Sequence, residues 1–514
     1  MSGITIASLA GMAAYLLVIF FIGRAAYRRN IKGDLDDQYL VGRSLNPFVL
    51  VGTLFATWFS TFAFLGGPGT YYLNGVNWLL FGFFNSMGPV LIWVFGGRMW
   101  ALGRRYGFVT PGDLLATYYD DSRRVRVLSA GVGIAVLFPY AAIQIAGIAK
   151  AVAGATDNAV PYTAGLLIVA VSVGLYSIFG GARAIVWTDV IQGFIFALVL
   201  LATSALVVGW AGGWTDGWQQ AIDTNPDKMA FTGDTAGAYF TTMLLWTFGW
   251  VLTPHLWQRM YMARSPRVLG VSMVFASGLS LWVVTFTGAI IGFLAMGLFP
   301  NIPQGFDSDA LTPLLYREFL PAGAVMLVVA TFAAGMSTLD SQVISGSSLF
   351  TLDIFRESRP DTSRMQLSTV GRWFEALFVL GLVLFAAFPA SQALIIPLAS
   401  VGVGFGLALL MPLIGALYWP RATEAAAFWS MLSGFAVMLV LQLTGWTEQL
   451  PTTFGPPAWG FFASVVLFYG ISFATQPVSG QRREQFHGYL DQTFSTAREP
   501  LPTTATPASG TSAT

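Results

Sequence analysis

Hydroxyl-bearing side chains crowd one apolar stretch of the chain, residues 330–350, which reads ATFAAGMSTLDSQVISGSSLF. At helical period its small and hydroxyl residues fall on a single stripe. Small residues let another backbone approach closely, and hydroxyl oxygens can replace the water around a hard cation. The alternative is a packing face whose hydroxyls bond back to their own helix. The stripe consists of Ala334, Ser337, Thr338, Ser341 and Ser345.

The composition is typical of a protein that crosses a membrane many times. The chain has 514 residues, of which 55% are hydrophobic and 10% charged, whereas a soluble domain carries about 25% charged residues. A formal net charge of +1 gives no sign of a nucleic-acid partner. The sequence has no cysteine and two histidines, His255 and His487, so disulfides are excluded and a histidine metal cluster is not expected.

We expect an all-α polytopic membrane protein with about 13 transmembrane helices. Basic residues are concentrated in every second loop, for example at 24–43, 104–126 and 259–267. This alternation places the N-terminus outside and the C-terminus in the cytoplasm of a bacterial inner (plasma) membrane. The first apolar segment has no basic residue before it, so it is expected to be a spanning helix rather than a secretory signal. Residues 481–514 are polar and are expected to form a disordered cytoplasmic tail.

Two of the expected spans contain residues that interrupt helices. The span at 45–73 has Pro68 among three glycines, and the span at 236–262 has Gly249 and Pro254. A helix that faces lipid cannot leave backbone groups unsatisfied, but a broken helix inside a bundle can direct them at a cavity. Broken helices at corresponding places in two halves of a chain indicate a transporter site, while an ordinary proline kink is the alternative.

Polar and aromatic residues at mid-span are the first candidates for contact with a solute. Tyr140 and Gln144 are four residues apart and share a helix face, as do Trp246 and Trp250. A glutamine at this depth faces protein or a cavity rather than lipid. Substrate contact and an inter-helix hydrogen bond therefore stay open for Gln144, and binding or core packing stays open for the tryptophans.

A single carboxylate, Asp189, lies near the cytoplasmic end of the expected span at 184–211. A carboxylate in this position needs a partner, a cation or water. Arg183 is close in sequence, and if it is the partner the pair is structural.

Several motifs resemble those of the sodium:solute symporter family, and they follow in order across roughly residues 5–475. They are GGARAIVWTDVIQ, AAGMSTLDSQ, GRSLNPF, FLGGPG and GWVLTPHLWQRMYMA. The resemblance implies the leucine-transporter-type fold with two inverted five-helix repeats. These repeats would be residues 45–212 and 236–419, with an extra helix and loop at 1–44 and two C-terminal helices at 420–480.

The resemblance also implies a sodium site between the expected spans at 45–73 and 321–350. It identifies Asp189 with the family's acidic residue on the cation's exit route, which couples or guides the ion without being a direct ligand. Trp58 stands where the proline carriers have an aspartate, and this argues against proline as the substrate. The implied sodium ligands are the carbonyls of Ala56, Phe59 and Ala334 and the hydroxyls of Ser337 and Thr338.

We therefore interpret the chain as a sodium-coupled symporter that imports a small organic solute by alternating access, as a monomer or weak oligomer in the lipid bilayer. The expected substrate is a monocarboxylate or a pantothenate-like acid. A neutral or zwitterionic nutrient such as an amino acid is the alternative. The sequence shows no Lys or Arg among the expected pocket residues, so half-helix N-termini and hydroxyls would hold an anion. The expected substrate-binding residues are Thr57, Trp58, Ser60, Tyr140, Gln144, Trp246 and Trp250.

Other classes of protein fit the sequence less well. A transporter-like sensor would have a long ordered signalling domain, but the polar C-terminal segment here is short. A channel would need a continuous polar pore and repeated filter loops. An enzyme would need a catalytic triad, a metal cluster or a phosphate-binding loop, and the sequence has none of these patterns.

The expected orientation can be tested by cysteine labelling, because the chain has no native cysteine. Single cysteines placed in residues 25–43 or after Gln481 should react with an impermeant maleimide only after cells are permeabilised, since both segments are expected to be cytoplasmic. A cysteine beside Lys228, in a loop expected outside, is the positive control. Labelling of both segments in intact cells would contradict the layout.

Overall fold

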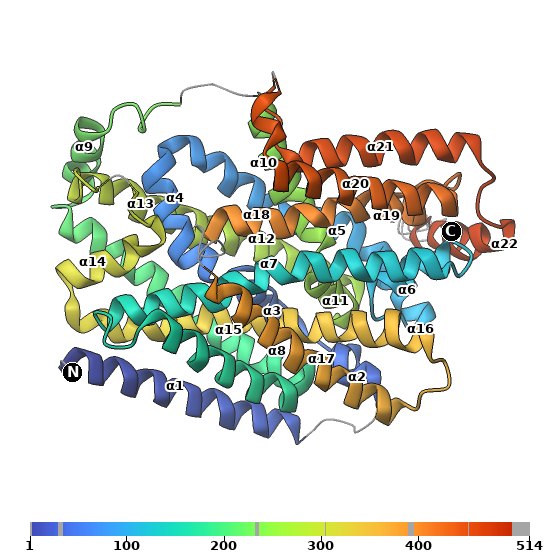
Figure 1. Cartoon of the computed structure of the whole chain (residues 1–514), viewed down its shortest axis with the longest axis horizontal. Helices are drawn as coiled ribbons and strands as arrows, with labels where there is room; N and C mark the ends of the chain where they lie inside the picture. Colours follow the sequence, from blue (N-terminus) through green and yellow to red (C-terminus); the bar gives the residue numbers. More distant parts are fainter. Residues whose placement is uncertain are drawn as a thin grey trace, which may run out of the picture.

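Apolar runs long enough to cross a bilayer fold as helices throughout the chain (Figure 1). Within the described residues the regular elements are helical, and the one β feature is an isolated bridge between Leu45 and Ala263. The expected all-α class is therefore confirmed. The computed structural model describes residues 3–28, 34–231, 236–303, 305–388, 395–450 and 452–495.

In this described part, ten helices are long and apolar enough, by length and composition, to cross a membrane. Three further apolar helices, at Pro47–Trp58, Tyr162–Gly174 and Ala236–Leu252, are shorter than the roughly 20 residues that a span needs. The expected number of about 13 spans stays a prediction. The ten long helices are Gly3–Ala26, Phe62–Tyr106, Arg123–Ala155, Gly181–Trp210, Pro266–Leu298, Pro321–Ser358, Arg364–Ala387, Ile395–Tyr418, Glu424–Thr444 and Pro456–Ala474.

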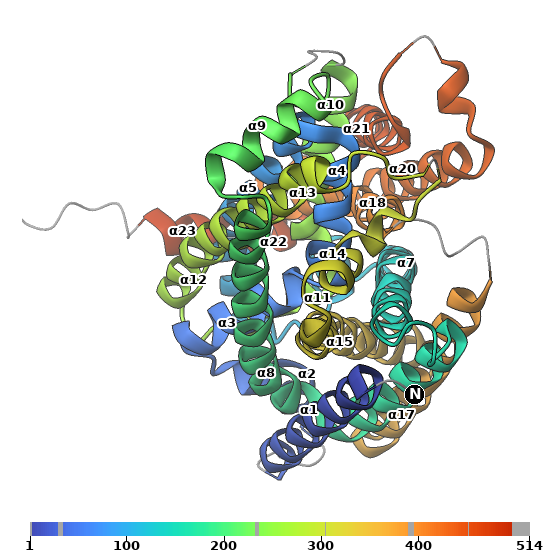
Figure 2. The same ribbon diagram turned by 90° about the vertical axis from the view of Figure 1, so that its left-hand side faces the viewer.

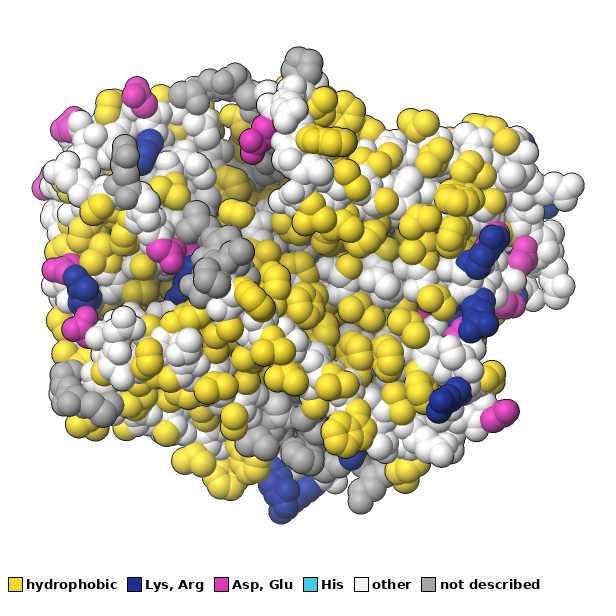
Figure 3. Space-filling view, viewed as in Figure 1, with side chains coloured by type: hydrophobic (Ala, Val, Ile, Leu, Met, Phe, Trp, Pro, Cys, Tyr) yellow, Lys and Arg dark blue, Asp and Glu magenta, His cyan; other side chains and the backbone are white. Residues whose placement is uncertain are grey.

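The long helices run side by side along the longest axis of the molecule (Figure 1). Hydrophobic side chains cover much of the middle of the face in Figure 3, while many of the Lys, Arg, Asp and Glu side chains lie toward its left and right ends and others at its upper and lower edges. This surface suits a bilayer whose apolar core meets the middle of the bundle. The helices of this bundle include α1 (Gly3–Tyr27), α5 (Leu79–Tyr106), α7 (Arg123–Ala155), α8 (Tyr162–Trp210), α12 (Pro266–Leu279), α13 (Phe286–Leu298), α17 (Arg364–Ala387), α18 (Ile395–Gly406), α20 (Glu424–Thr444) and α21 (Pro456–Ala474).

The first expected break occurs earlier in the chain than its proline suggested. Helix α3 (Pro47–Trp58) begins at the N-cap Asn46, whose side chain accepts from the Val49 N–H at 3.0 Å. It ends because Phe59 is extended, with φ −104° and ψ 114°. A π-helical turn and α4 (Gly67–Asn74) follow, with Pro68 in the first turn of α4. The helix is continuous from the π-helical turn into α4, because Gly66 and Gly67 both have helical φ and ψ, so Pro68 lies inside a helix and is not the break.

The second expected break lies where the sequence placed it. Helix α10 (Ala236–Met243) continues through a π-helical segment, Leu244–Gly249, and a 3₁₀ turn, Trp250–Leu252. Thr253 is then extended, and α11 (Pro254–Met262) starts with Pro254 in its first turn. Both interrupted helices thus contain a residue in extended conformation between two helical halves.

Helix α15 (Ala324–Ser348), which carries the hydroxyl stripe, is buried at the centre of the molecule. It packs against α1, α3, α7 and α8, and Figure 2 shows α15 between α7 and α8. Helix α8 joins two of the expected spans, and Gly181 separates them with φ +66°, a conformation that suits glycine. The buried position of α15 means that its hydroxyls must bond within the protein or bind a ligand.

Two peripheral elements test the remaining expectations. A short helix, α6 (Pro111–Tyr118), precedes α7, with a capping box at Thr110 and Pro111 at its start. The expected disorder of the whole C-terminal segment is wrong for residues 481–495.

Residues 480–495 form α22 (Gly480–Arg483), a π-helical segment and α23 (Tyr489–Ser495). They are ordered because Phe486 packs on Tyr118, at a ring-centroid distance of 5.3 Å, and Leu490 is buried. His487 lies 3.0 Å from the Tyr118 hydroxyl, and burial lowers the pKa of its ring to about 4. Residues 496–514 of the expected tail, and residues 29–33 of the first expected cytoplasmic loop, lie outside the described residues.

Candidate functional site

The end of α3 and the middle of α15 bring a group of oxygen atoms together. The last carbonyls of a helix have no partner within the helix, and at the end of α3 two of them face α15. The Ser337 hydroxyl lies 2.8 Å from the Ala56 carbonyl oxygen and 3.0 Å from that of Ala334. The Thr338 hydroxyl lies 3.1 Å from the Thr57 carbonyl oxygen and 3.3 Å from that of Ala56.

These oxygens outnumber the hydrogen-bond donors among them. A hydroxyl carries one proton, and the two hydroxyls face the Ala56 and Thr57 carbonyls at the end of α3, while the Ala334 carbonyl also belongs to the backbone ladder of α15. The residues of this group are each at most 1% exposed: Ala56, Thr57, Ala334, Ser337 and Thr338. Buried lone pairs without a donor are costly, and a cation can satisfy several of them at once. The group contains no charged side chain, which favours a hard monovalent cation.

Phe59 completes the set of residues implied as ligands. Its N–H still donates to the Phe55 carbonyl at 3.0 Å, but its extended backbone takes its own carbonyl out of the helical pattern. The hydrogen bonds above join four of the five implied ligand residues, Ala56, Ala334, Ser337 and Thr338. The fifth, Phe59, lies at the break itself. Clusters of three or more His, Cys, Asp or Glu side chains, which a structural metal would use, are absent from the described residues.

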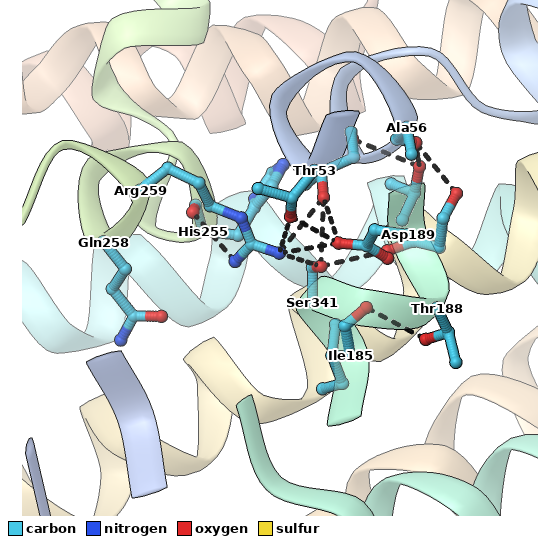
Figure 4. Close-up of polar contacts among 12 residues, drawn as sticks. Thr53, Ala56, Ile185, Thr188, Asp189, His255, Gln258, Arg259 and Ser341 are labelled. Carbon is cyan, nitrogen blue, oxygen red and sulfur yellow. Dashed lines mark hydrogen bonds and ion pairs between the residues drawn. The ribbon is translucent and has the colours of Figure 1, made fainter. Parts of the chain in front are cut away.

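A buried ion pair lies beside this group of oxygens (Figure 4). Asp189 Oδ2 accepts from the Thr53 hydroxyl at 2.6 Å and from the Thr57 hydroxyl at 3.1 Å. The same oxygen is 3.2 Å from Arg259 Nη2, which also donates to the Ser341 hydroxyl at 2.5 Å. The Asp189 and Arg259 side chains are 0% and 1% exposed. One carboxylate and one guanidinium thus join α3, α8, α11 and α15.

The ion pair and the oxygen group share the same two helices. Thr57 follows Ala56 in α3, and its hydroxyl lies 3.2 Å from that of Ser341. The Ser341 hydroxyl in turn donates to the Ser337 carbonyl at 2.9 Å, one helical turn away. Thr57, expected among the substrate-binding residues, therefore faces the Asp189 side of the site.

The partner of Asp189 is not the residue that sequence proximity suggested. Arg183 forms an ion pair with Asp37 instead. Arg259 was assigned to a cytoplasmic loop and its burial was missed, because it follows a helix break and is close to other arginines. The signal that could have identified it is its place on an apolar helix, together with the need of Asp189 for a buried cation.

The expected aromatic residues form one cluster between the two broken helices. The Trp246 ring stacks on Phe62 at 5.6 Å, with 6° between the planes, and lies 5.6 Å from Trp250. The Trp250 ring is 5.5 Å from Trp58 and 5.4 Å from Tyr140. The three tryptophans are at most 1% exposed. The structure thus brings together residues from α3, α7 and the segment between α10 and α11.

The polar residues beside this cluster bond to the first break. The Tyr140 hydroxyl donates to the Trp58 carbonyl at 3.2 Å and lies 3.4 Å from the Ser60 hydroxyl. Gln144 Oε1 accepts from the Thr61 hydroxyl at 2.8 Å and from the Thr61 N–H at 3.3 Å. The inter-helix hydrogen bond considered for Gln144 is therefore present, and it fixes the start of the second half of the broken helix.

Two broken helices, a buried group of carbonyl and hydroxyl oxygens and an adjacent aromatic cluster in a polytopic bundle are typical of ion-coupled secondary transporters. The family model "Sodium:solute symporter family" matches residues 38–434. The chain is 30% identical over 444 residues to the sodium/pantothenate symporter of Escherichia coli, covering 84% of this chain and 89% of the relative. It is 27% identical over 455 residues to that organism's sodium/proline symporter, covering 84% and 87%.

A solved structure extends the likeness to the fold. A sodium-coupled sialic acid symporter, bound to substrate in an outward-open state, superposes with a TM-score of 0.78 at 18% identity, covering 92% of this chain and 98% of the other. The chain belongs to the sodium:solute symporter family. It is a sodium-coupled secondary active transporter of a small organic solute with the leucine-transporter-type fold, and not an enzyme.

Replacing either hydroxyl at the contact of α3 and α15 should raise the sodium requirement. Ser337→Ala and Thr338→Ala each remove one proposed oxygen ligand, and the loss of a hydrogen bond to a charged group costs roughly 1.5–3 kcal/mol. Because 1.4 kcal/mol is a factor of ten, the sodium concentration for half-maximal transport should rise about ten-fold or more in each variant. Uptake measured across a sodium titration checks this.

Thr331→Ala is the matched control, since this hydroxyl is buried on the same helix and donates to the Leu327 carbonyl at 2.8 Å. Sodium titrations that coincide for wild type, Ser337→Ala and Thr338→Ala would place the ion elsewhere.

Proposed function

We propose that the transported solute is a small monocarboxylate of the pantothenate type, taken up together with sodium. The observation that carries this proposal is the 30% identity, over 84% of the chain, to a sodium/pantothenate symporter. A second relative of the same name, from Haemophilus influenzae, is 29% identical over the same share of the chain. The aromatic cluster of Trp58, Trp246 and Trp250 provides an apolar surface for the carbon skeleton of such an acid.

In this proposal sodium binds to the carbonyls and hydroxyls between α3 and α15 before the solute binds. The proposed ligands are the carbonyls of Ala56, Phe59 and Ala334 and the hydroxyls of Ser337 and Thr338. When the ion binds, these carbonyl and hydroxyl oxygens contact the ion instead of one another. The ion thereby holds α3 against α15. A ligand shifts a conformational equilibrium only by its differential affinity, so sodium must bind the outward-facing state better. The membrane potential contributes about 2.3 kcal/mol per charge per 100 mV to its entry.

Asp189 has the role of guiding the ion toward the cytoplasm in this proposal. Its carboxylate accepts from the hydroxyl of Thr57, the residue after the proposed ligand Ala56, and is paired with Arg259. An arriving sodium ion can interact with Asp189 while the guanidinium keeps its contacts with the Thr57 and Ser341 hydroxyls. Asp189 is thus a residue of the path and not a permanent ligand.

The two five-helix repeats, residues 45–212 and 236–419, are part of the same proposal. Their support is the pair of interrupted helices, each with one extended residue, Phe59 in the first and Thr253 in the second. The orientation with the N-terminus outside and the C-terminus in the cytoplasm rests on the arginine-rich loops.

A neutral or zwitterionic solute such as an amino acid is the second candidate. It is favoured by the 27% identity to a sodium/proline symporter. Trp58 argues against it, because this bulky ring fills the position next to the break where a carboxylate could otherwise pair with an amine.

Uptake into proteoliposomes should separate the two candidates. With an inward sodium gradient, a labelled pantothenate-type acid should accumulate and labelled proline should not. Trp246→Ala and Gln144→Ala should weaken the apparent affinity for the acid by about ten-fold, because they remove aromatic surface and the bond to the broken helix. Their sodium dependence should change less.

Trp373→Ala is the matched control, since this tryptophan is 69% exposed on α17. Accumulation of proline with no accumulation of the acid would favour the amino acid. Wild-type affinity in both variants would mean that these residues serve packing alone.

A further inference from the structure

One side chain that the sequence did not single out joins the two tryptophans of the broken helices. Asn85, in α5, is 0% exposed. Its Oδ1 accepts from Trp250 Nε1 at 2.6 Å and from Trp58 Nε1 at 3.3 Å. Its Nδ2 donates to the Ser280 hydroxyl at 3.3 Å. One amide therefore contacts both interrupted helices and the segment between α12 and α13.

The next turn of α5 leaves space for the ring of Trp58. A Cβ atom at Gly88 would lie 2.7 Å from Trp58 Cζ2 and 2.8 Å from Cη2, closer than such atoms approach in proteins. Residues three apart in a helix share a face, so Asn85 holds the indole N–H while Gly88 leaves room for the ring. Two neighbouring positions on one helix face thus set the orientation of Trp58.

These bonds decide which part of each indole is available to a solute. An indole nitrogen is a donor only, and an amide oxygen has two acceptor sites. Asn85 Oδ1 uses both of its sites on Trp58 and Trp250. Both rings are buried in this structure. In the state in which a solute reaches them, they offer their carbon faces and no N–H group, and a solute hydroxyl that lies against them loses its water without gaining a partner.

We propose that Asn85 is a positioning residue that makes the Trp58–Trp250 pair an apolar surface and so selects solutes whose carbon chain lacks a hydroxyl at that place. This inference rests on the proposed uptake of a monocarboxylate and adds the part of the solute that the tryptophans contact. Asn85→Ala frees both indole N–H groups, which can then donate to a solute hydroxyl. A hydrogen bond of this kind changes discrimination by about ten-fold, or 1.4 kcal/mol.

The test compares two acids that differ in one hydroxyl, pentanoate and 5-hydroxypentanoate, in sodium-driven uptake by proteoliposomes. The quantity measured is the ratio of kcat/KM for the two acids. Wild type should prefer pentanoate, and Asn85→Ala should shift the ratio about ten-fold toward the hydroxylated acid. The sodium concentration for half-maximal uptake should stay unchanged, because Asn85 contacts none of the proposed sodium ligands.

A second variant keeps the test decisive if Asn85→Ala fails to fold. Trp250→Phe leaves Asn85 Oδ1 with a free acceptor site, so it should shift the same ratio in the same direction. Asn77→Ala is the control: it removes an amide from the segment preceding α5, where Asn77 Oδ1 lies 3.5 Å from the Tyr239 hydroxyl and takes no part in the tryptophan pair.

The outcomes separate the inference from the proposed function. If wild type accumulates neither the labelled pantothenate-type acid nor pentanoate, the proposed function fails and the inference fails with it. If wild type accumulates the pantothenate-type acid but neither pentanoate nor 5-hydroxypentanoate, the inference alone is refuted. If wild type takes up pentanoate but the ratio in both variants equals that of wild type or of Asn77→Ala, the inference alone is refuted.

Discussion

The hydrogen bonds from the α15 hydroxyls to the free carbonyls at the end of α3 are the contact on which the rest of the site depends. An interrupted helix is stable inside an apolar bundle only if its unpaired carbonyls find partners. Ser337 and Thr338 supply them through their hydroxyls. The same break is the place where the proposed function puts the sodium ion.

The Asp189–Arg259 pair ties this contact to the second broken helix. Arg259 belongs to α11, while the hydroxyls that it contacts belong to α3 and α15. Removing one member of a buried pair costs roughly 3–5 kcal/mol, because the other charge is left uncompensated. A movement that separates α3 from α15 must also rearrange this pair. The proposed cation site, the Asp189–Arg259 pair and the tryptophans bonded to Asn85 thus form one connected region.

The sequence predicted the helical class and the two interrupted helices from hydropathy and helix breakers, whereas the residues of the oxygen group were implied by the resemblance to the symporter family. It did not locate the first break, because Pro68 lies inside a continuous helical segment and the extended residue is Phe59. It missed Arg259 and Asn85, whose roles depend on partners far away in the chain. The hydrophobic pattern says that a residue is buried, but not which distant side chain it meets.

Thermal unfolding of the purified protein at constant ionic strength tests the central claim most directly. A ligand that binds only the folded state stabilises it by RT ln(1 + [L]/Kd), about 2.7 kcal/mol at one hundred times Kd. The account predicts that sodium raises the melting temperature in proportion to the logarithm of its concentration above Kd. It also predicts that potassium has no such effect and that the double variant Ser337→Ala/Thr338→Ala loses the sodium effect. Equal melting temperatures in sodium and potassium for wild type, or an undiminished sodium effect in the double variant, would contradict it.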